Sequence, residues 1–526
     1  MAQSHTRVSP WAPFHHRPYA VIWTATLVAN MGTWMYGSAA GWLMTTLTAD
    51  PFMVSMVQVA ATLPMFLFAL PAGALADVID ARRLLVWVEG AIIVAAIPFA
   101  LLVELDRMTP VLLLAFTFLL ESGAAMGAPA WQSIVPRLVP RDELPAAVAA
   151  NSVSINMSRA LGPALGGFLT SAIAIAAPFW VNAFSNVGSI AALVWWRPRD
   201  RARDGLAAER LASAIRTGLR FTRNNPPLRA TLARAVAFFF FASAYWALLP
   251  LIARTQVAGG PELYGLLLAS IGAGAIGGAF AIPWLRARLG ADGLVAAGQV
   301  GTALAMLLFG LARQPAMAVA ASLLAGVCWI AAVSTLNVSA QVSLPDWVRA
   351  RGLAVYVAVM FGSMTIGSAI WGEVASWAGL GFANFAAAAG AFLGIPLTWH
   401  WKLHRGQALD LTPSMYWPEP IVTTTVEDDD GPVLVTVEYR IAPEHRDAFL
   451  DAKDALERQR RRGGGYAWGL FEDMSTPGRF VETFRVESWI EHLRQHDRGT
   501  AADRALDGRV RGYSTAAPAA THFIAR

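Results

Sequence analysis

Two ionisable residues lie deep within long apolar stretches: Glu121 within residues 109–130 and Arg159 within residues 146–172. A charge at bilayer depth is costly, and it therefore faces a partner or a cavity. Because only a short loop joins the two stretches, we expect the two charges to meet near the bilayer midplane. A glutamate that releases its partner and takes up a proton suits proton-driven transport. The alternative is a permanent ion pair that holds two helices together.

A glycine-rich segment follows the arginine, with Gly162, Pro163, Gly166 and Gly167 in the order G-P-A-L-G-G. Glycines spaced by small residues let helix backbones approach closely in lipid. Proline frees a backbone carbonyl that a neighbouring helix or a polar side chain must satisfy. The segment therefore predicts a tight contact between helices.

A charged loop follows the second apolar stretch, where Gly73 and Asp77 precede Arg82 and Arg83. An aspartate at the cytoplasmic end of a helix, followed closely by arginines, predicts a charge latch between helices that breaks when the bundles rock. Glu89 lies near the same end of the next stretch, and we expect it to join this latch through Arg82 or Arg83.

Polar and aromatic residues elsewhere in the apolar stretches are candidates for the wall of a substrate cavity, although packing or interfacial anchoring is the alternative for each. They are Asn30, Trp34, Tyr36, Gln58 and Asn156. The chain has no GxxxxGK[ST] motif, so direct drive by ATP is unsupported. Cys328 is the one cysteine, which excludes an internal disulfide and a multi-cysteine metal site. We assign no catalytic residue, metal or cofactor.

Composition places these residues in a membrane protein. The chain has 526 residues, of which 56% are hydrophobic and 15% charged, whereas soluble proteins carry about 25% charged residues. The net charge of +5 could indicate nucleic-acid binding, but the arginines lie between apolar stretches, so we expect no nucleic-acid partner.

Twelve stretches of about 20 apolar residues are long enough to span a bilayer. They fall near 18–43, 52–76, 84–104, 109–130, 146–172, 178–196, 230–253, 262–285, 293–312, 315–340, 352–376 and 379–402. The sequence thus predicts an all-α polytopic protein with two six-helix bundles, at 18–200 and 229–405. Lys and Arg gather in the loops on one side, which predicts that the 1–17 tail and the C-terminus are both cytoplasmic.

The two halves also repeat. A shift of 205 residues places Pro140 on Pro345, Gly162 on Gly367, Gly167 on Gly372, Gly73 on Gly278 and Arg83 on Arg288. One shift that satisfies both loop and helix landmarks indicates duplicated bundles related by an axis along the membrane normal.

Three further segments complete the chain. Residues 201–228 join the halves, and within them 205–223 predict a basic amphipathic helix on the membrane surface, with Leu211, Ile215 and Leu219 on its apolar face; a plain tether is the alternative. Residues 406–431 form a proline-rich, acidic linker. Residues 432–526 alternate as strands and helices in the order βαββαβ, which predicts a small ferredoxin-like α+β domain.

The charged loop resembles the signature of the major facilitator superfamily, G-x-L-a-D-r-x-G-r-r. Gly73, Leu75, Asp77 and Arg82 match it, whereas Val78, Asp80 and Ala81 depart from it. Residues 162–167 resemble the G-P-x-x-G-G motif that the superfamily associates with exporters of the proton-antiport type. The family's arginine motif in the fourth helix is absent, since 119–123 read LLESG.

Residues 136–163 resemble a bacterial subgroup that includes the enterobactin exporter, often called transmembrane secretion effectors. This resemblance implies a secondary exporter of a siderophore, drug or secondary metabolite in the bacterial inner membrane, working by alternating access and proton antiport. Residues 432–526 resemble the dimeric, antibiotic-biosynthesis-monooxygenase-like α+β barrels, which implies dimerisation or regulation. Import of the small molecule, or a membrane-tethered, cofactor-free oxygenase acting through this domain, are the alternatives.

Overall fold

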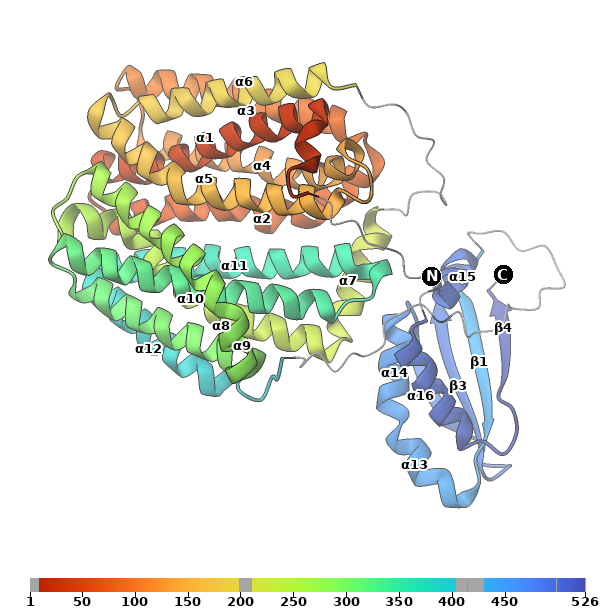
Figure 1. Cartoon of the computed structure of the whole chain (residues 1–526). Coiled ribbons are helices and arrows are strands. Elements are labelled where there is room, and N and C mark those ends of the chain that lie inside the picture. Colours follow the sequence, from red (N-terminus) through yellow and green to blue (C-terminus); the bar gives the residue numbers. More distant parts are fainter. Residues whose placement is uncertain (1–8, 198–210, 404–413, 415–429, 498, 526) are drawn as a thin grey trace. The chain divides into compact units, whose positions relative to one another are not determined.

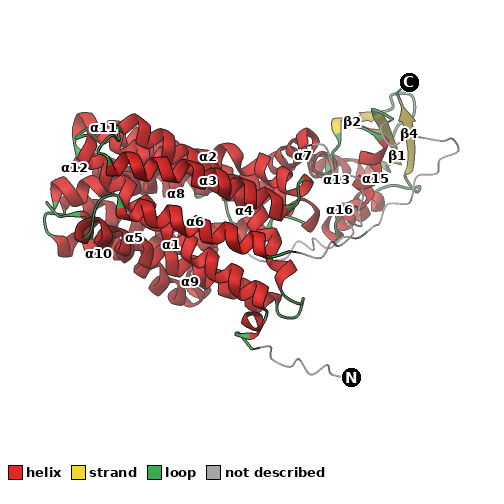
Figure 2. Ribbon diagram, turned by 90° about the horizontal axis from the view of Figure 1, so that it is seen from above, coloured by secondary structure: helices red, strands yellow, loops and turns green. Residues whose placement is uncertain are grey.

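The computed structural model describes residues 9–197, 211–403, 414, 430–497 and 499–525. They form two compact units. One unit contains Met1–Ala208, Leu232–Asn337 and Tyr356–Lys402, and the other contains Glu209–Thr231, Val338–Val355 and Leu403–Arg526. The four strands, drawn yellow in Figure 2, all lie in the second unit.

Six long helices form the N-terminal half, drawn red to yellow in Figure 1: α1 (Arg17–Leu47), α2 (Pro51–Val78), α3 (Ala81–Glu104), α4 (Pro110–Leu138), α5 (Leu144–Ala172) and α6 (Ala177–Trp195). A short 3-10 helix, η1 (Ala12–His15), precedes them. Local sequence fixes where two of them begin, because a capping side chain stands directly before a proline. Asp50 accepts a hydrogen bond from Phe52 N at 3.0 Å, and Thr109 accepts one from Leu112 N at 3.3 Å.

The helices after the linker form the C-terminal half: α8 (Pro226–Leu251), α9 (Pro261–Leu311), α10 (Pro315–Val342), α11 (Asp346–Ala378) and α12 (Leu380–Thr398), with a π-helical turn at Ile252–Gln256. A straight helix of the 51 residues of α9 would measure about 76 Å, far more than a bilayer core. It breaks at Gly290, whose φ of +68° suits glycine. Its two limbs contain the predicted stretches 262–285 and 293–312.

Nine helices of the described ranges are long and apolar enough to cross a membrane. This count treats α9 as one helix. It does not include α1 and α5, although these have 31 and 29 residues. The prediction of a mostly helical, polytopic membrane protein is therefore confirmed, while the number of twelve spans stays a prediction.

Helix pairing brings α5 to the boundary between the halves. Within the N-terminal half, α1 packs on α5 and α6, α4 packs on α2 and α3, and α3 packs on α6. Across the boundary, α5 packs along α9. By contrast, α4 and α5 make few contacts with each other although they are consecutive. The structure therefore leaves room beside α4 inside the N-terminal half.

The C-terminal domain has the element order expected from the sequence: β1 (Val433–Arg440), α13 (Arg446–Asp451) and α14 (Lys453–Arg462), β2 (Tyr466–Glu472), β3 (Arg479–Val486), α15 (Trp489–Asp497) and α16 (Ala501–Gly512), and β4 (Ala519–Ile524). A 3-10 turn, η3 (Pro443–His445), precedes α13. The strands are antiparallel in the order β2-β3-β1-β4. The expected alternation also holds, because every second residue from Val433 to Ile441 is buried in the domain core.

The linker residues form a helix, α7 (Leu211–Arg223). Gly218 and Phe221 are buried, and the Phe221 ring packs edge-on against Trp347 at 5.6 Å. Leu219 is exposed, and the side chains of Leu211 and Ile215 lie outside the described residues. The buried side of α7 therefore packs on protein, and the placement of its apolar face on the membrane stays a prediction.

Candidate functional site

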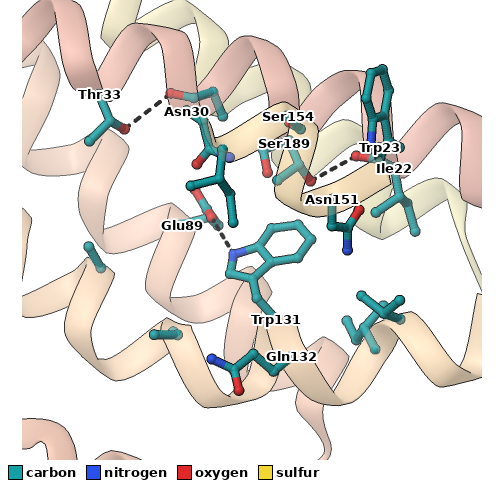
Figure 3. A pocket seen from close by; sticks show the side chains of 18 of the residues that line it. Ile22, Trp23, Asn30, Thr33, Glu89, Trp131, Gln132, Asn151, Ser154 and Ser189 are labelled. Carbon is teal, nitrogen blue, oxygen red and sulfur yellow. Dashed lines mark hydrogen bonds between the residues drawn. The ribbon is translucent and has the colours of Figure 1, made fainter. Parts of the chain in front are cut away.

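A cavity of about 680 Å³ lies inside the N-terminal half, lined by α1, α3, α4, α5 and α6 (Figure 3). Its volume suits a drug-sized molecule. Most of the wall is apolar, and small polar side chains are scattered over it: Asn30, Thr33, Asn151, Ser154, Asn182, Asn186 and Ser189. An apolar wall with a few polar groups is typical of a site that binds an amphipathic small molecule.

Glu89 is one of two carboxylates in this cavity. Its side chain is buried, and its Oε1 accepts a hydrogen bond from Trp131 Nε1 of α4 at 3.3 Å, drawn as a dashed line in Figure 3. Its Oε2 has no hydrogen-bond partner among the described residues. The expectation that Glu89 joins the charge latch is therefore wrong: eight residues of helix, about 12 Å, carry it away from the start of α3 and into the cavity.

Glu121 of α4 is the second carboxylate in the cavity wall. One helical turn before it, Thr117 shares a 2.8 Å hydrogen bond with Tyr36 of α1, and Tyr36 also lines the cavity. Glu121 and Arg159 form no ion pair among the residues that the structure describes, so the expected meeting of the two charges does not occur here.

Arg159 lies instead at the boundary between the halves. Its guanidinium carbon lies 5.3 Å from the centre of the Trp34 ring, and its Nε has no hydrogen-bond partner in the described structure. The surrounding residues include Trp246 and Trp329 of the C-terminal half, and the space that they leave is only about 10 Å³. Arg159 therefore contributes to the packing between the halves in this conformation, apart from the large cavity.

The cavity candidates from the sequence divide into two groups. Asn30 and Tyr36 line the large cavity. Trp34 packs against Arg159, Asn156 is exposed and donates to Ser152 O at 2.8 Å, and Gln58 lies on α2, which does not contribute to the cavity. These three residues do not line the large cavity, and their assignment to a substrate cavity stays a prediction.

Sequence reasoning missed several residues of the wall. Trp131 partners Glu89, and Asn182 and Asn186 stand one turn apart on α6, where Asn186 Nδ2 donates to Asn182 O at 2.8 Å. The sequence signal for Asn182 and Asn186 is two asparagines four residues apart in an apolar stretch.

The C-terminal half contains a buried ion pair outside this cavity, Arg234 with Asp292 at 3.1 Å.

The charged residues at the start of α3 tie helices together within the N-terminal half. Arg82 donates from Nε to Leu193 O at 2.7 Å and from Nη2 to Val194 O at 3.0 Å, and so caps the C-terminus of α6. Asp80 accepts from Arg83 N at 3.0 Å and lies 3.7 Å from Arg137. A Cβ atom added to Gly73 would meet nothing within 4 Å, and the Asp77 side chain lies outside the described residues. A latch through Asp77 therefore stays a prediction.

The glycine segment of α5 packs on two helices at once. A Cβ atom on Gly166 would lie 2.9 Å from Met35 O of α1, and Gly162 likewise meets Trp34. On the other side, a Cβ atom on Gly167 would lie 3.1 Å from Gly265 Cα of α9. Glycine is required here because no side chain fits between α5 and its two neighbours.

Further contacts between the halves gather at the end of the molecule where α1 passes into α2. Arg254 donates to Thr45 at 3.1 Å and Ser376 donates to Asp50 at 2.9 Å. Deeper along α2, Thr62 shares a 2.8 Å hydrogen bond with Thr365. The two halves are therefore closed against each other at this end.

The C-terminal domain contains a buried polar cluster. Glu482 is fully buried and accepts hydrogen bonds from Tyr439, Trp468 and Arg460, each at 2.9 Å, and Asp507 lies 3.3 Å from Arg460. Burial alone would lower the pKa of Arg460, but the two carboxylates hold that pKa well above its usual value. The hydrogen bonds and ion pairs of this cluster stabilise the charges of Glu482, Arg460 and Asp507 inside the core of the C-terminal domain.

On α15, His492 is completely buried between Trp489 and His522, with ring centres 5.5 and 4.6 Å away. The His496 side chain lies outside the described residues.

A family profile described as transmembrane secretion effector matches residues 8–526. The chain belongs to the transmembrane secretion effector family. It is therefore a multi-pass membrane transporter of the major facilitator type, and the profile extends over the C-terminal sheet domain as well as both halves.

Two curated relatives show how this family member compares with named transporters. The chain is 26% identical over 377 residues to the multidrug efflux pump Tap of Mycolicibacterium fortuitum, which covers 69% of this chain and 90% of that protein. It is 26% identical over 252 residues to the uncharacterized MFS-type transporter YfiS of Bacillus subtilis, covering 47% of this chain. The match spans only 59% of YfiS, and a match to the staphyloferrin A transporter of Staphylococcus aureus spans 37% of that protein.

Solved structures share the transporter fold. A POT family transporter in complex with a thioalcohol-conjugated peptide gives a TM-score of 0.59 at 12% identity, covering 73% of this chain and 96% of that one. The nucleoside transporter NupG gives a TM-score of 0.56 at 10% identity, covering 73% and 98%. At these identities the likeness concerns the fold alone.

Proposed function

We propose that this family member exports a small molecule across the bacterial inner membrane in exchange for protons, by alternating access between its two halves. The observation that carries the proposal is the cavity of the N-terminal half, which holds Glu89 and Glu121 deep within membrane helices. Carboxylates at such depth mark proton and substrate pathways. The name of the relative Tap, an efflux pump, supports the outward direction over import.

Closure at the α1–α2 end supports alternating access, because a transporter of this type is sealed on one side at a time. We assign the C-terminal domain to regulation or dimerisation of the transporter, since one family profile covers both.

We further propose twelve spans with both termini in the cytoplasm. The nine counted helices, the second limb of α9, and α1 and α5 supply them. Basic residues in the loops set the orientation. An alkaline phosphatase fused after Arg405 should be inactive. Strong phosphatase activity of that fusion would show that this end of the chain lies outside the cytoplasm and would contradict the proposed orientation.

Substitution of Glu121 tests proton coupling. Glu121→Gln keeps the shape of the side chain but cannot exchange a proton, so efflux of ethidium from proteoliposomes driven by an imposed pH gradient should fall at least about tenfold. Downhill ethidium movement without the gradient should persist. Glu104→Gln, on an exposed site at the far end of α3, is the matched control and should transport normally.

Arg159→Ala extends this test. Because Arg159 does not pair with Glu121 in the structure, the two substitutions should act independently, and their effects on the logarithm of the efflux rate should add. Full gradient-driven efflux by Glu121→Gln would remove Glu121 from the coupling mechanism.

A further inference from the structure

The charges of the cavity wall are unbalanced. Among the described residues that line it, Glu89 and Glu121 are the ionisable acids and no lysine, arginine or histidine is present. The remaining titratable groups of the wall are the phenols of Tyr19 and Tyr36. When a carboxylate here is ionised, the protein supplies no cation to pair with it.

Glu89 shows this imbalance at the level of atoms. It is 6% exposed, its Oε1 accepts from Trp131, and its Oε2 faces no donor among the described side chains. A buried charge of this kind is costly until a proton or a positive partner neutralises it. The unsatisfied oxygen therefore marks the position where the positive part of a bound molecule is most stabilised.

Aromatic rings complete the environment. Trp131 stands beside Glu89 in the cavity (Figure 3), and Trp23, Tyr19 and Tyr36 also line the wall. The faces of such rings attract cations, most strongly where water is excluded. An aromatic wall with a carboxylate, and room of about 680 Å³, fits a bulky apolar body that carries one positive charge.

We propose that the transported molecules are lipophilic cations, bound with the positive centre at Oε2 of Glu89 and beside the ring face of Trp131. This inference rests on the proposed function and deepens it by naming the class of substrate. The same site disfavours a free anionic siderophore whenever its carboxylates are ionised, because like charges repel. Since a proton and a cation neutralise the same carboxylate, one leaves when the other binds.

Equilibrium binding to the full chain in detergent tests the proposal with tetraphenylphosphonium, a permanent cation, as the probe. The wild-type chain should bind it more tightly as the pH rises, because ionised Glu89 is the binding form. Glu89→Gln should weaken binding roughly 10- to 100-fold, the range for a charge-assisted contact, and flatten the pH dependence. Glu104→Gln, the same change on the same helix outside the cavity, should bind like the wild type.

Trp131→Leu separates the aromatic contribution. It should weaken binding several-fold, and Trp131→Phe should restore most of the loss, because a benzene ring keeps a cation-binding face. Equal affinity of wild type and Glu89→Gln, or binding of tetraphenylborate in preference to the cation, would overturn the proposal. If Glu89→Gln does not fold, wild-type preference for the cation and its pH dependence still test the class of ligand, and the two Trp131 substitutions test whether the site lies beside Glu89 or at Glu121.

The outcomes also separate this inference from the proposed function. Gradient-driven efflux of ethidium without Glu89-dependent binding of tetraphenylphosphonium would leave the exporter proposal standing and remove the carboxylate site. Tight, Glu89-dependent binding without any gradient-driven efflux in proteoliposomes would keep the cation site and overturn proton-driven export.

Discussion

Gly167→Val is expected to abolish transport, because its side chain would occupy the place of Gly265 in α9. A Cβ atom on Gly167 already lies 3.1 Å from Gly265 Cα, so the two halves could not close at this contact. Overpacking that costs the closed state about 3 kcal/mol lowers its population roughly 100-fold. The efflux rate in proteoliposomes should fall accordingly, while the protein still inserts into the membrane.

The matched control lies on α9, where Gly265 contacts α5 and Gly277 has nothing within 4 Å of its Cβ position. Gly265→Val should reproduce the loss, and Gly277→Val should transport normally. Whether the halves stay open can be measured from the accessibility of a cysteine at their contact. The chain for this experiment carries Thr45→Cys, and its buried Cys328 is replaced by alanine. Maleimide should label this cysteine faster in Gly167→Val than in the parent, and equal labelling would mean that the glycine contact does not control closure.

Glu482→Leu should destabilise the C-terminal domain by about 3–5 kcal/mol, the range for breaking a buried ion pair from one side. The change leaves Arg460 buried with Asp507 alone and removes the acceptor of Tyr439 and Trp468. Hydrogen exchange of β1 and β3 amides in the full chain should become much faster. Replacing Arg460 by methionine and Asp507 by asparagine together with Glu482→Leu should recover part of the loss, because no member of the buried charge cluster then lacks its partner.

Glu438→Leu is the comparison for that experiment. Glu438 lies on β1 and pairs with Arg479 at 2.8 Å, but both side chains are partly exposed. A solvated pair contributes little, so amide exchange should change far less than in Glu482→Leu. Similar exchange rates in the two variants would show that the buried cluster does not stabilise the domain.

Much of the architecture could be predicted from the sequence because it depends on patterns along the chain. Runs of apolar residues mark the long helices, and alternation from Val433 to Ile441 marks the first strand. The sequence also places a tight contact at Gly162–Gly167. These features need no knowledge of neighbouring helices.

The wall of the cavity could not be predicted in the same way. Counting residues gives the depth of Glu121 and Arg159, but each residue turns the helix by about 100°, and the direction of a side chain depends on how the helix packs. Thus Glu121 faces the interior of one half, whereas Arg159 faces Trp34 and the other half. The same reason explains why Glu89 was assigned to the helix end.

In the C-terminal domain, the strand pattern of the sequence is enough to recognise Glu482 as a buried charge. It stands in the buried phase of the β3 alternation, between Phe480 and Phe484. A charged residue in that phase signals a buried partner, which is Arg460.

Every described residue that lines the cavity belongs to the N-terminal bundle, and this has a thermodynamic consequence for the transport cycle. When the halves rock, bound cargo keeps the same surrounding atoms, and the side of the membrane to which its site opens is what changes. Rocking by itself then gives equal affinity on both faces, and a ligand cannot bias an equilibrium between states that bind it equally. Under the proton exchange proposed above, the difference in affinity between the two faces of the membrane arises within that bundle, from protonation of its carboxylates.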